Sequence, residues 1–117
     1  MSLFVEGKEI VEKVKFADTF FKRFIGLMFK RNIDCALVFV LPIESKVNAA
    51  LHSMFMFEPI DVLFLNSKKE VVDTTTLFPW RFYMPKRKAK YVVEMPQGII
   101  EKFNIRIGQK VDWDKHL

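Results

Sequence analysis

The chain has 117 residues, of which 50% are hydrophobic, and its formal net charge is +5. This is enough apolar material for the core of one globular domain, and the mild positive charge permits anionic partners. The single cysteine, Cys35, excludes an internal disulfide and any Cys-x-x-Cys zinc or redox site.

No apolar run approaches the roughly 18 residues that a membrane-spanning helix needs. The apolar residues Leu3, Phe4 and Val5 are followed at once by Glu6, which is unlike an export signal. We therefore expect a cytoplasmic protein with no membrane partner.

Two short strands are predicted first, over residues 3–6 and 9–16, on either side of a turn at Gly7-Lys8. In the second of them apolar residues alternate with polar ones, as they do in a strand with one buried face.

Asp18 or Thr19 can cap a helix that runs to about Met28 with its apolar side chains on one face. After it, residues 36–41 form a continuous apolar run that Pro42 closes. This pattern is typical of a strand that is buried on both faces.

The second half of the chain predicts further strands over residues 50–57, 60–65, 71–76 and 90–95. Residues 66–69 are expected to form a hairpin loop, and residues 77–88 a long connection with two prolines. Residues 99–103 predict a helical turn, and a last hairpin is centred on Gly108-Gln109.

Short strands separated by turn signals predict a mainly β fold. We expect a compact β-sandwich or jelly-roll-like domain, or a small half-open barrel, with one or two short helices. No linker, repeat or low-complexity tract divides the chain, so residues 1–117 are taken as a single domain.

Six motifs follow one another along the chain: GLMFKR, LVFV, LHSMFMFEPIDVLFLNSKKEVVD, FPWR, YVVEMPQG and NIRIGQKV. In this order they resemble the family known as domain of unknown function 192, over a core of about residues 26–113. The resemblance implies a compact, mainly β domain of sandwich or jelly-roll type, and it implies no activity. Glu58 stands where the family has a basic or small residue, and Asn66 where an aspartate is usual.

Asp61 is the most informative polar residue, because it lies in the apolar stretch LHSMFMFEPIDVLFLN. An unpaired buried carboxylate costs several kcal/mol, so we expect Asp61 to have a partner. In one interpretation it accepts backbone N–H groups of the 53–59 loop and holds that loop closed. In the other it orients His52 or binds a cation.

His52 is the only histidine outside the C-terminal tail. It is the candidate general base of an alternative function as a hydrolase or isomerase, in which Asp61 orients it. Ser53 follows His52 directly, and consecutive strand residues point to opposite faces, which disfavours a Ser–His nucleophile pair. No metal site is expected, because a second nitrogen or sulfur ligand is missing nearby, and no cofactor is expected.

Arg81 in FPWRF is a natural counter-charge. Its guanidinium can stack on Trp80 and hold a carboxylate through two hydrogen bonds. That carboxylate is either Asp61, Glu94 or an anionic ligand. In the first two cases the pair would pin the long connection across the sheet.

The run PKRKAK follows the aromatic segment WRFYM. Its cations, together with the aromatic side chains, are suited to single-stranded nucleic acid, although such runs are usually solvated loops. Nucleic acid is therefore a possible partner that we do not favour. The residues concerned are Arg81, Lys86, Arg87, Lys88 and Lys90.

The favoured function is that of a non-catalytic binding module for a small anionic ligand or a peptide at an aromatic-lined patch. Its candidate residues are His52, Ser53, Met56, Asp61, Trp80, Arg81 and Glu94. The sequence names no ligand or reaction, and an enzyme is the less favoured alternative. The many phenylalanines also allow a homodimer face.

Overall fold

The computed structural model describes residues 1–17, 34–46, 49, 51–52 and 57–113, and of residues 17, 51 and 52 it describes the backbone alone. The predicted helix that begins at Asp18 or Thr19 lies outside these residues, and so do Ser53 and Met56.

The described part of the chain is mainly β-strand. The strands are β1 (Leu3–Val5), β2 (Lys8–Val11), β3 (Val14–Ala17), β4 (Ala36–Ser45), β5 (Leu51–His52), β6 (Ile60–Leu65), β7 (Val71–Leu77), β8 (Phe82–Tyr83), β9 (Ala89–Pro96) and β10 (Val111–Trp113). One short helix, α2 (Ile99–Phe103), follows β9.

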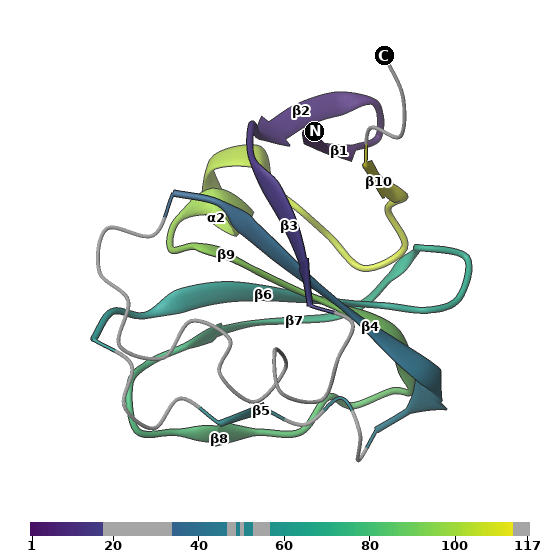
Figure 1. Cartoon of the computed structure of the whole chain (residues 1–117), viewed down its shortest axis with the longest axis vertical. Helices are drawn as coiled ribbons and strands as arrows, with labels where there is room; N and C mark the ends of the chain where they lie inside the picture. Colours follow the sequence, from purple (N-terminus) through teal and green to yellow (C-terminus); the bar gives the residue numbers. More distant parts are fainter. Residues whose placement is uncertain (18–33, 47–48, 50, 53–56, 114–117) are drawn as a thin grey trace.

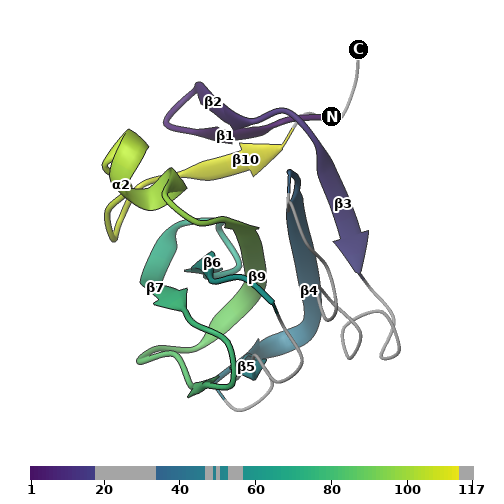
Figure 2. The ribbon, with the colours of Figure 1, turned by 90° about the vertical axis from the view of Figure 1, so that its left-hand side faces the viewer.

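The described residues form three sheets. A cluster of buried apolar side chains lies on each face of the central one. The central sheet has the order β3-β4-β9-β6-β7, and the outer sheets are β10-β1-β2 and β5-β8. Figures 1 and 2 show the central sheet between the other two, with α2 on the side of β10-β1-β2. This small β-sandwich-like arrangement confirms the predicted fold class.

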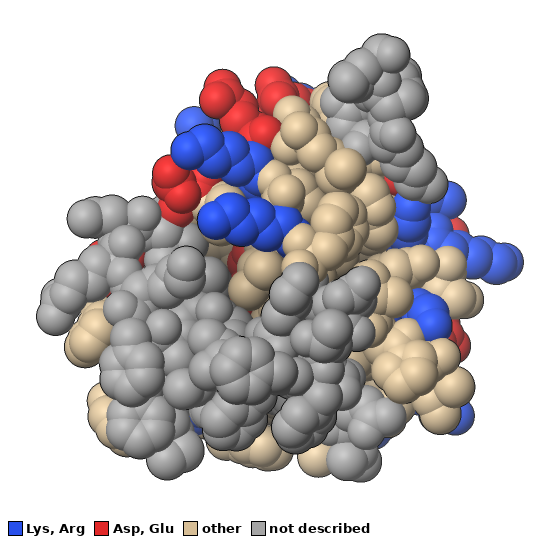
Figure 3. All heavy atoms as spheres, in the orientation of Figure 1, with Lys and Arg blue, Asp and Glu red and all other residues tan. Residues whose placement is uncertain are grey.

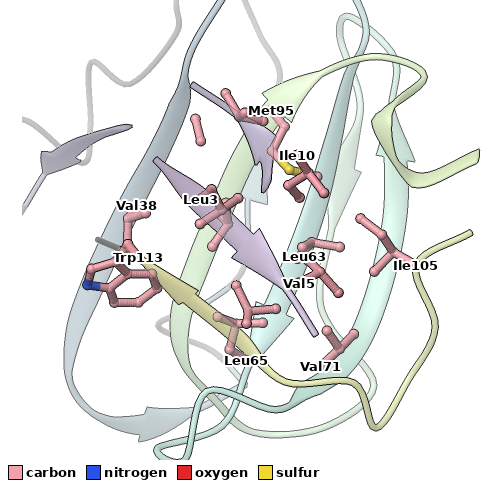
Figure 4. Packing of buried hydrophobic residues seen from close by; sticks show 14 residues of the cluster. Leu3, Val5, Ile10, Val38, Leu63, Leu65, Val71, Met95, Ile105 and Trp113 are labelled. Atoms are coloured by element: carbon pink, nitrogen blue, oxygen red, sulfur yellow. The ribbon is translucent and has the colours of Figure 1, made fainter. Parts of the chain in front are cut away.

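The burial of strand β6 reflects the central position of its sheet. All six of its residues are buried, which is the burial expected when both faces of a strand are covered. Leu63 and Leu65 pack with residues of β1, β2 and β10 in a cluster that we call the first core cluster, shown in Figure 4. Val62 and Phe64 point the other way, into the cluster that contains Tyr83 of β8.

Aromatic side chains close the edge of the first cluster. The Trp113 ring lies 5.8 Å from that of Phe16 and 5.3 Å from that of Tyr91, both edge to face. The Nζ atom of Lys69 lies 4.2 Å from the centre of the same indole ring, on which its charge is favourably placed.

The N-terminal strands differ from the prediction. The expected strand over residues 9–16 is two strands, β2 and β3, which belong to different sheets. The turn before β2 lies at Glu6-Gly7, where positive φ angles of 51° and 78° give the twist that a tight hairpin needs. Local alternation cannot show that a chain leaves one sheet for another.

Strand β4 continues past Pro42 to Ser45, although a proline was expected to end it. The β4–β9 register is irregular between Val40 and Ser45. Pro42 is exposed in this stretch, where its missing N–H removes no regular ladder bond.

The predicted last hairpin about Gly108-Gln109 is wrong. Strand β10 pairs with β1 instead, and the Gly108 N–H donates to the carbonyl of Val71. Burial explains this outcome, since Val111 completes the first core cluster while Ile107 remains 66% exposed.

Candidate functional site

Asp61 is a structural anchor. It is only 1% exposed, and its Oδ1 atom accepts a 2.8 Å hydrogen bond from the Thr76 hydroxyl. Its Oδ2 atom accepts the N–H groups of Gly98 at 3.0 Å and Ile100 at 2.9 Å, at the start of α2. One carboxylate therefore joins β6 to β7 and to the turn after β9.

The structure corrects the expected partners of Asp61. Its described donors are a hydroxyl and two N–H groups of the α2 turn; they belong neither to the 53–59 loop nor to Arg81. The reason lies in the antiparallel β6–β9 register, which sets Asp61 opposite Met95 and so close to the chain that leaves β9.

The alternative with His52 as general base depends on Asp61 as its orienting group. The backbone of His52 in β5 pairs with that of Phe82 in β8, and its side chain is outside the description. The pairing of His52 with Asp61 therefore stays a prediction from the sequence.

Asp73 in β7 holds the long connection across the sheet, the role that was expected of an Arg81–carboxylate pair. It is 4% exposed and accepts the Tyr83 hydroxyl at 2.6 Å and the Lys86 N–H at 2.9 Å. These bonds hold residues 78–88, which we call the connection, across the sheet. Burial, together with the hydrogen bond and negative charge of Asp73, raises the pKa of Tyr83 to about 12, so the phenol remains a donor.

The sequence analysis did not single out Asp73. The signal was its place in VVDTTTL, where an acidic residue interrupts a strand pattern. The register places it opposite Phe64, on a buried face.

Glu94 is the third buried acid and the least satisfied. It is 6% exposed and lies between Leu37 of β4 and Val62 of β6. Within the described part of the chain no hydrogen bond or ion pair reaches its carboxyl group, and burial raises its pKa to about 8. A neutral acid on this face is a poor partner for the predicted Arg81 contact.

The start of the connection presents large apolar side chains to solvent. Trp80 is 56% exposed and Phe82 67% exposed, and Arg81 between them is also exposed. Phe78 and Met84, which are nearby in sequence, are also exposed large hydrophobic residues. We call residues 78–82 the aromatic segment.

Trp80 has an unusual backbone. Its φ is 63°, and it follows Pro79 in a turn. A turn with proline at its second position and a positive φ at its third usually has glycine or asparagine there, because a bulky side chain is strained in that conformation. The sequence carries no signal for a tryptophan in this role.

The predicted nucleic-acid residues divide into two groups. Lys86, Arg87 and Lys88 are exposed at the end of the connection. Lys90 donates to the carbonyl oxygen of Pro42 at 3.0 Å and so contributes to the β4–β9 contact. Lys86, Arg87 and Lys88 also line a surface hollow of about 930 Å³, of which neither Asp61 nor Arg81 is a lining residue.

In the part of the chain that the structure describes, no three His, Cys, Asp or Glu side chains gather closely enough to hold a metal ion. Likewise, no helix in that part has the length and apolar character to cross a membrane.

The fold and these buried acids define a small β-sandwich-like domain with a pinned aromatic and basic connection. The family model DUF192, described as "Uncharacterized ACR", matches residues 2–113. The chain belongs to this family, as its motifs indicated. The match includes β1 and β2, which lie before the motif-based start at residue 26 and which pack into the first core cluster.

Two similar proteins carry only a family designation as their names. The UPF0127 protein PF1050 of Pyrococcus furiosus is 56% identical over 112 residues, 96% of each chain. A UPF0127 protein of Thermococcus sibiricus is 52% identical over 93% of this chain and 71% of its own length. The crystal structure of a protein of unknown function from Novosphingobium aromaticivorans has a TM-score of 0.82 at 19% identity, covering 97% of this chain and 84% of the other. The last likeness shows the fold alone.

Replacement of Asp61 by alanine should lower the free energy of unfolding by about 3–5 kcal/mol, because two N–H groups of the α2 turn and a hydroxyl lose their charged acceptor. Asp61→Asn should cost less, since its amide oxygen can still accept both N–H groups. Urea unfolding measures both variants, and hydrogen exchange at Gly98 and Ile100 should accelerate in the alanine variant. A loss below about 1 kcal/mol for Asp61→Ala would contradict the anchoring role.

Glu94 predicts a pH dependence of stability. Its pKa is raised from 4.5 to about 8, so between these values the folded state binds more protons than the unfolded state. The free energy of unfolding should therefore fall by a few kcal/mol as the pH rises through this window. Glu94→Gln should flatten this fall and be the more stable protein at pH 8, as urea unfolding at pH 5 and pH 8 would show.

The exposed Glu101 of α2 supplies the control for this comparison. Glu101→Gln removes the same charge from the surface and should keep the wild-type slope. Equal slopes for the wild type and Glu94→Gln would show that the Glu94 carboxyl ionises as freely when folded as when unfolded.

Proposed function

We propose that this protein is a non-catalytic binding module, and that its ligand combines an anionic group with an apolar or aromatic part. The aromatic segment is the proposed binding surface. The observation that supports it most is the left-handed backbone conformation of Trp80, a residue whose indole is half-exposed.

Such a conformation costs an L-residue about 1–2 kcal/mol. Strain of this kind persists where the surrounding structure fixes it, and it is frequent at ligand-binding sites. Here Pro79 precedes the strained residue, and Asp73 fixes the connection beyond it. The gain from burying the whole indole is also absent, since 56% of Trp80 is exposed. Ligand binding is a function that such a side chain can serve.

Arg81 is the proposed anion contact. It is exposed, and its Nη1 donates a long 3.4 Å hydrogen bond to the Trp80 carbonyl, which places the guanidinium close to the turn. A guanidinium can donate two parallel hydrogen bonds to a carboxylate, sulfonate or phosphate. Phe82 extends the apolar surface on the same segment.

The revised site keeps part of the predicted residue set. Asp61 is committed to the fold, and Glu94 is a neutral buried acid, so neither is proposed to contact the anion. His52 remains a candidate because its backbone is paired with that of Phe82, the last residue of the aromatic segment. Roles for Ser53 and Met56 remain predictions from the sequence.

The strain at Trp80 can be measured without a ligand. Trp80→Gly and Trp80→Ala remove the same indole, but only glycine lacks the Cβ that disfavours a positive φ. Trp80→Gly should be the more stable of the two by about 1 kcal/mol in urea unfolding.

Phe82 of β8 gives the matched comparison, because its φ is not positive. There glycine should be less stable than alanine by about 0.5–1 kcal/mol. The same order of stability at both positions would remove the argument from strain.

Binding is tested with 8-anilinonaphthalene-1-sulfonate, a probe that joins an aromatic system to a fixed anion. Arg81→Leu should weaken its binding about tenfold, because the charged hydrogen bond is lost, while Arg81→Lys should retain part of it. Fluorescence titration gives the Kd, and circular dichroism checks the fold. Lys15→Ala, which removes an exposed cation in β3, is the control. Unchanged affinity of Arg81→Leu would contradict this site.

A further inference from the structure

The hollow beside the end of the connection has cationic walls from two separate segments. Its volume is about 930 Å³, and it lies against the loop between β6 and β7. Figure 3, drawn in the orientation of Figure 1, shows Lys and Arg side chains at its right-hand edge, where Figure 1 places this loop. The lining residues are Glu44, Asn66, Ser67, Lys68, Glu70, Val72, Asp73, Lys86, Arg87, Lys88 and Ile107.

The carboxylates of the hollow are bonded within the fold. Glu44 accepts the N–H of Ser67 at 2.7 Å, and Glu70 accepts the side-chain amide of Asn66 at 2.9 Å. Asp73 accepts Tyr83 and the Lys86 N–H, as described above. The acids thus have structural partners, none of which is a side-chain cation.

The cations of the hollow are in the opposite situation. Among the described residues, no ion pair or hydrogen bond engages the side chains of Lys68, Lys86, Arg87 and Lys88. Other lysines on the same side are engaged, since Lys69 lies 3.2 Å from Asp112 and over Trp113. These four cations of the hollow are therefore left to solvent.

Both segments that carry these cations have a fixed backbone. The Asn66 Oδ1 atom accepts the N–H groups of Lys68 and Glu70, both at 2.9 Å, which shapes the β6–β7 loop. On the other wall, Asp73 holds the backbone of Lys86. A fixed backbone lowers the entropy that a ligand must overcome when it orders the side chains.

We infer that this hollow binds a small molecule that carries several phosphate charges, such as a polyphosphate or a phosphomonoester. The lining carries four cations and three carboxylates, so its formal net charge is +1. The carboxylates are held by donors of the fold, which leaves the four cationic side chains as the groups that can turn toward a multiply charged ligand. Val72 and the exposed Ile107 give an apolar wall for the rest of the ligand. The hollow shares no lining residue with the aromatic segment, so it constitutes a second site.

Inorganic tripolyphosphate is the probe, measured by isothermal titration calorimetry at low salt with the full chain. The double variant Arg87→Ala and Lys88→Ala should weaken its binding at least tenfold, and Lys68→Ala several-fold, because each removes a wall cation. Lys15→Ala again serves as the control and should change the Kd less than twofold.

Two comparisons distinguish a phosphate site at the hollow from general attraction of anions. Absent binding of tripolyphosphate, or an equal loss in Lys15→Ala, would overturn the inference, the latter because it shows only bulk charge. Citrate binding as tight as tripolyphosphate would overturn the preference for phosphate.

A single-stranded oligonucleotide is the remaining competitor. Tighter binding of the oligonucleotide, lost in the double variant, would assign the hollow to a nucleic-acid backbone and overturn the small-molecule ligand. Its binding should then fall steeply with added salt. Trp80→Gly should leave tripolyphosphate binding unchanged, so failure at the aromatic segment and failure at the hollow are distinguishable.

Discussion

The carboxylate of Asp61 is the interaction on which the arrangement of this domain depends. It lies on the most buried strand and accepts donors from β7 and from the turn into α2. A carboxylate can be buried at tolerable cost when donors surround it, and N–H groups at the start of a helix are suitable donors. The bond therefore fixes the direction in which the chain leaves β9 and the position of α2 against the first core cluster.

Three buried acids of the same sheet show how local surroundings decide the role of a carboxyl group. Asp61 satisfies the backbone of a turn, and Asp73 holds a phenol and an N–H of the connection. Glu94 has apolar register neighbours and a raised pKa instead. The first two stabilise the fold through the hydrogen bonds that they accept, and the third is tolerated because it is neutral at physiological pH.

The sequence predicted the features that depend on local patterns. Residues 60–65 were a strand because of their apolar pattern, and residues 99–103 a helical turn because the preceding Pro-Gln-Gly breaks β9. The opposite orientation of Asp61 to Val62 also followed from strand alternation. Its partners did not, because Gly98 is 37 residues away and is brought near only by the β6–β9 pairing.

Other features also depend on contacts between distant parts of the chain, so the local sequence pattern did not predict them. The pairing of β10 with β1 joins the two ends of the described chain, and the local pattern around Gly108 favours a hairpin that does not form. The φ of Trp80 depends on how the connection is held rather than on its own residue type. The cationic hollow combines Lys68 on one wall with Lys86 on the other, where Asp73 accepts the Lys86 N–H.

The position of Asp73 has a consequence for communication across the molecule. Its bonds to Tyr83 and Lys86 lie between the aromatic segment and the cationic end of the connection. A displacement that begins at Trp80 must break these buried bonds before it reaches Arg87. These bonds lie between the two proposed surfaces, so we expect occupation of one to leave the affinity of the other unchanged.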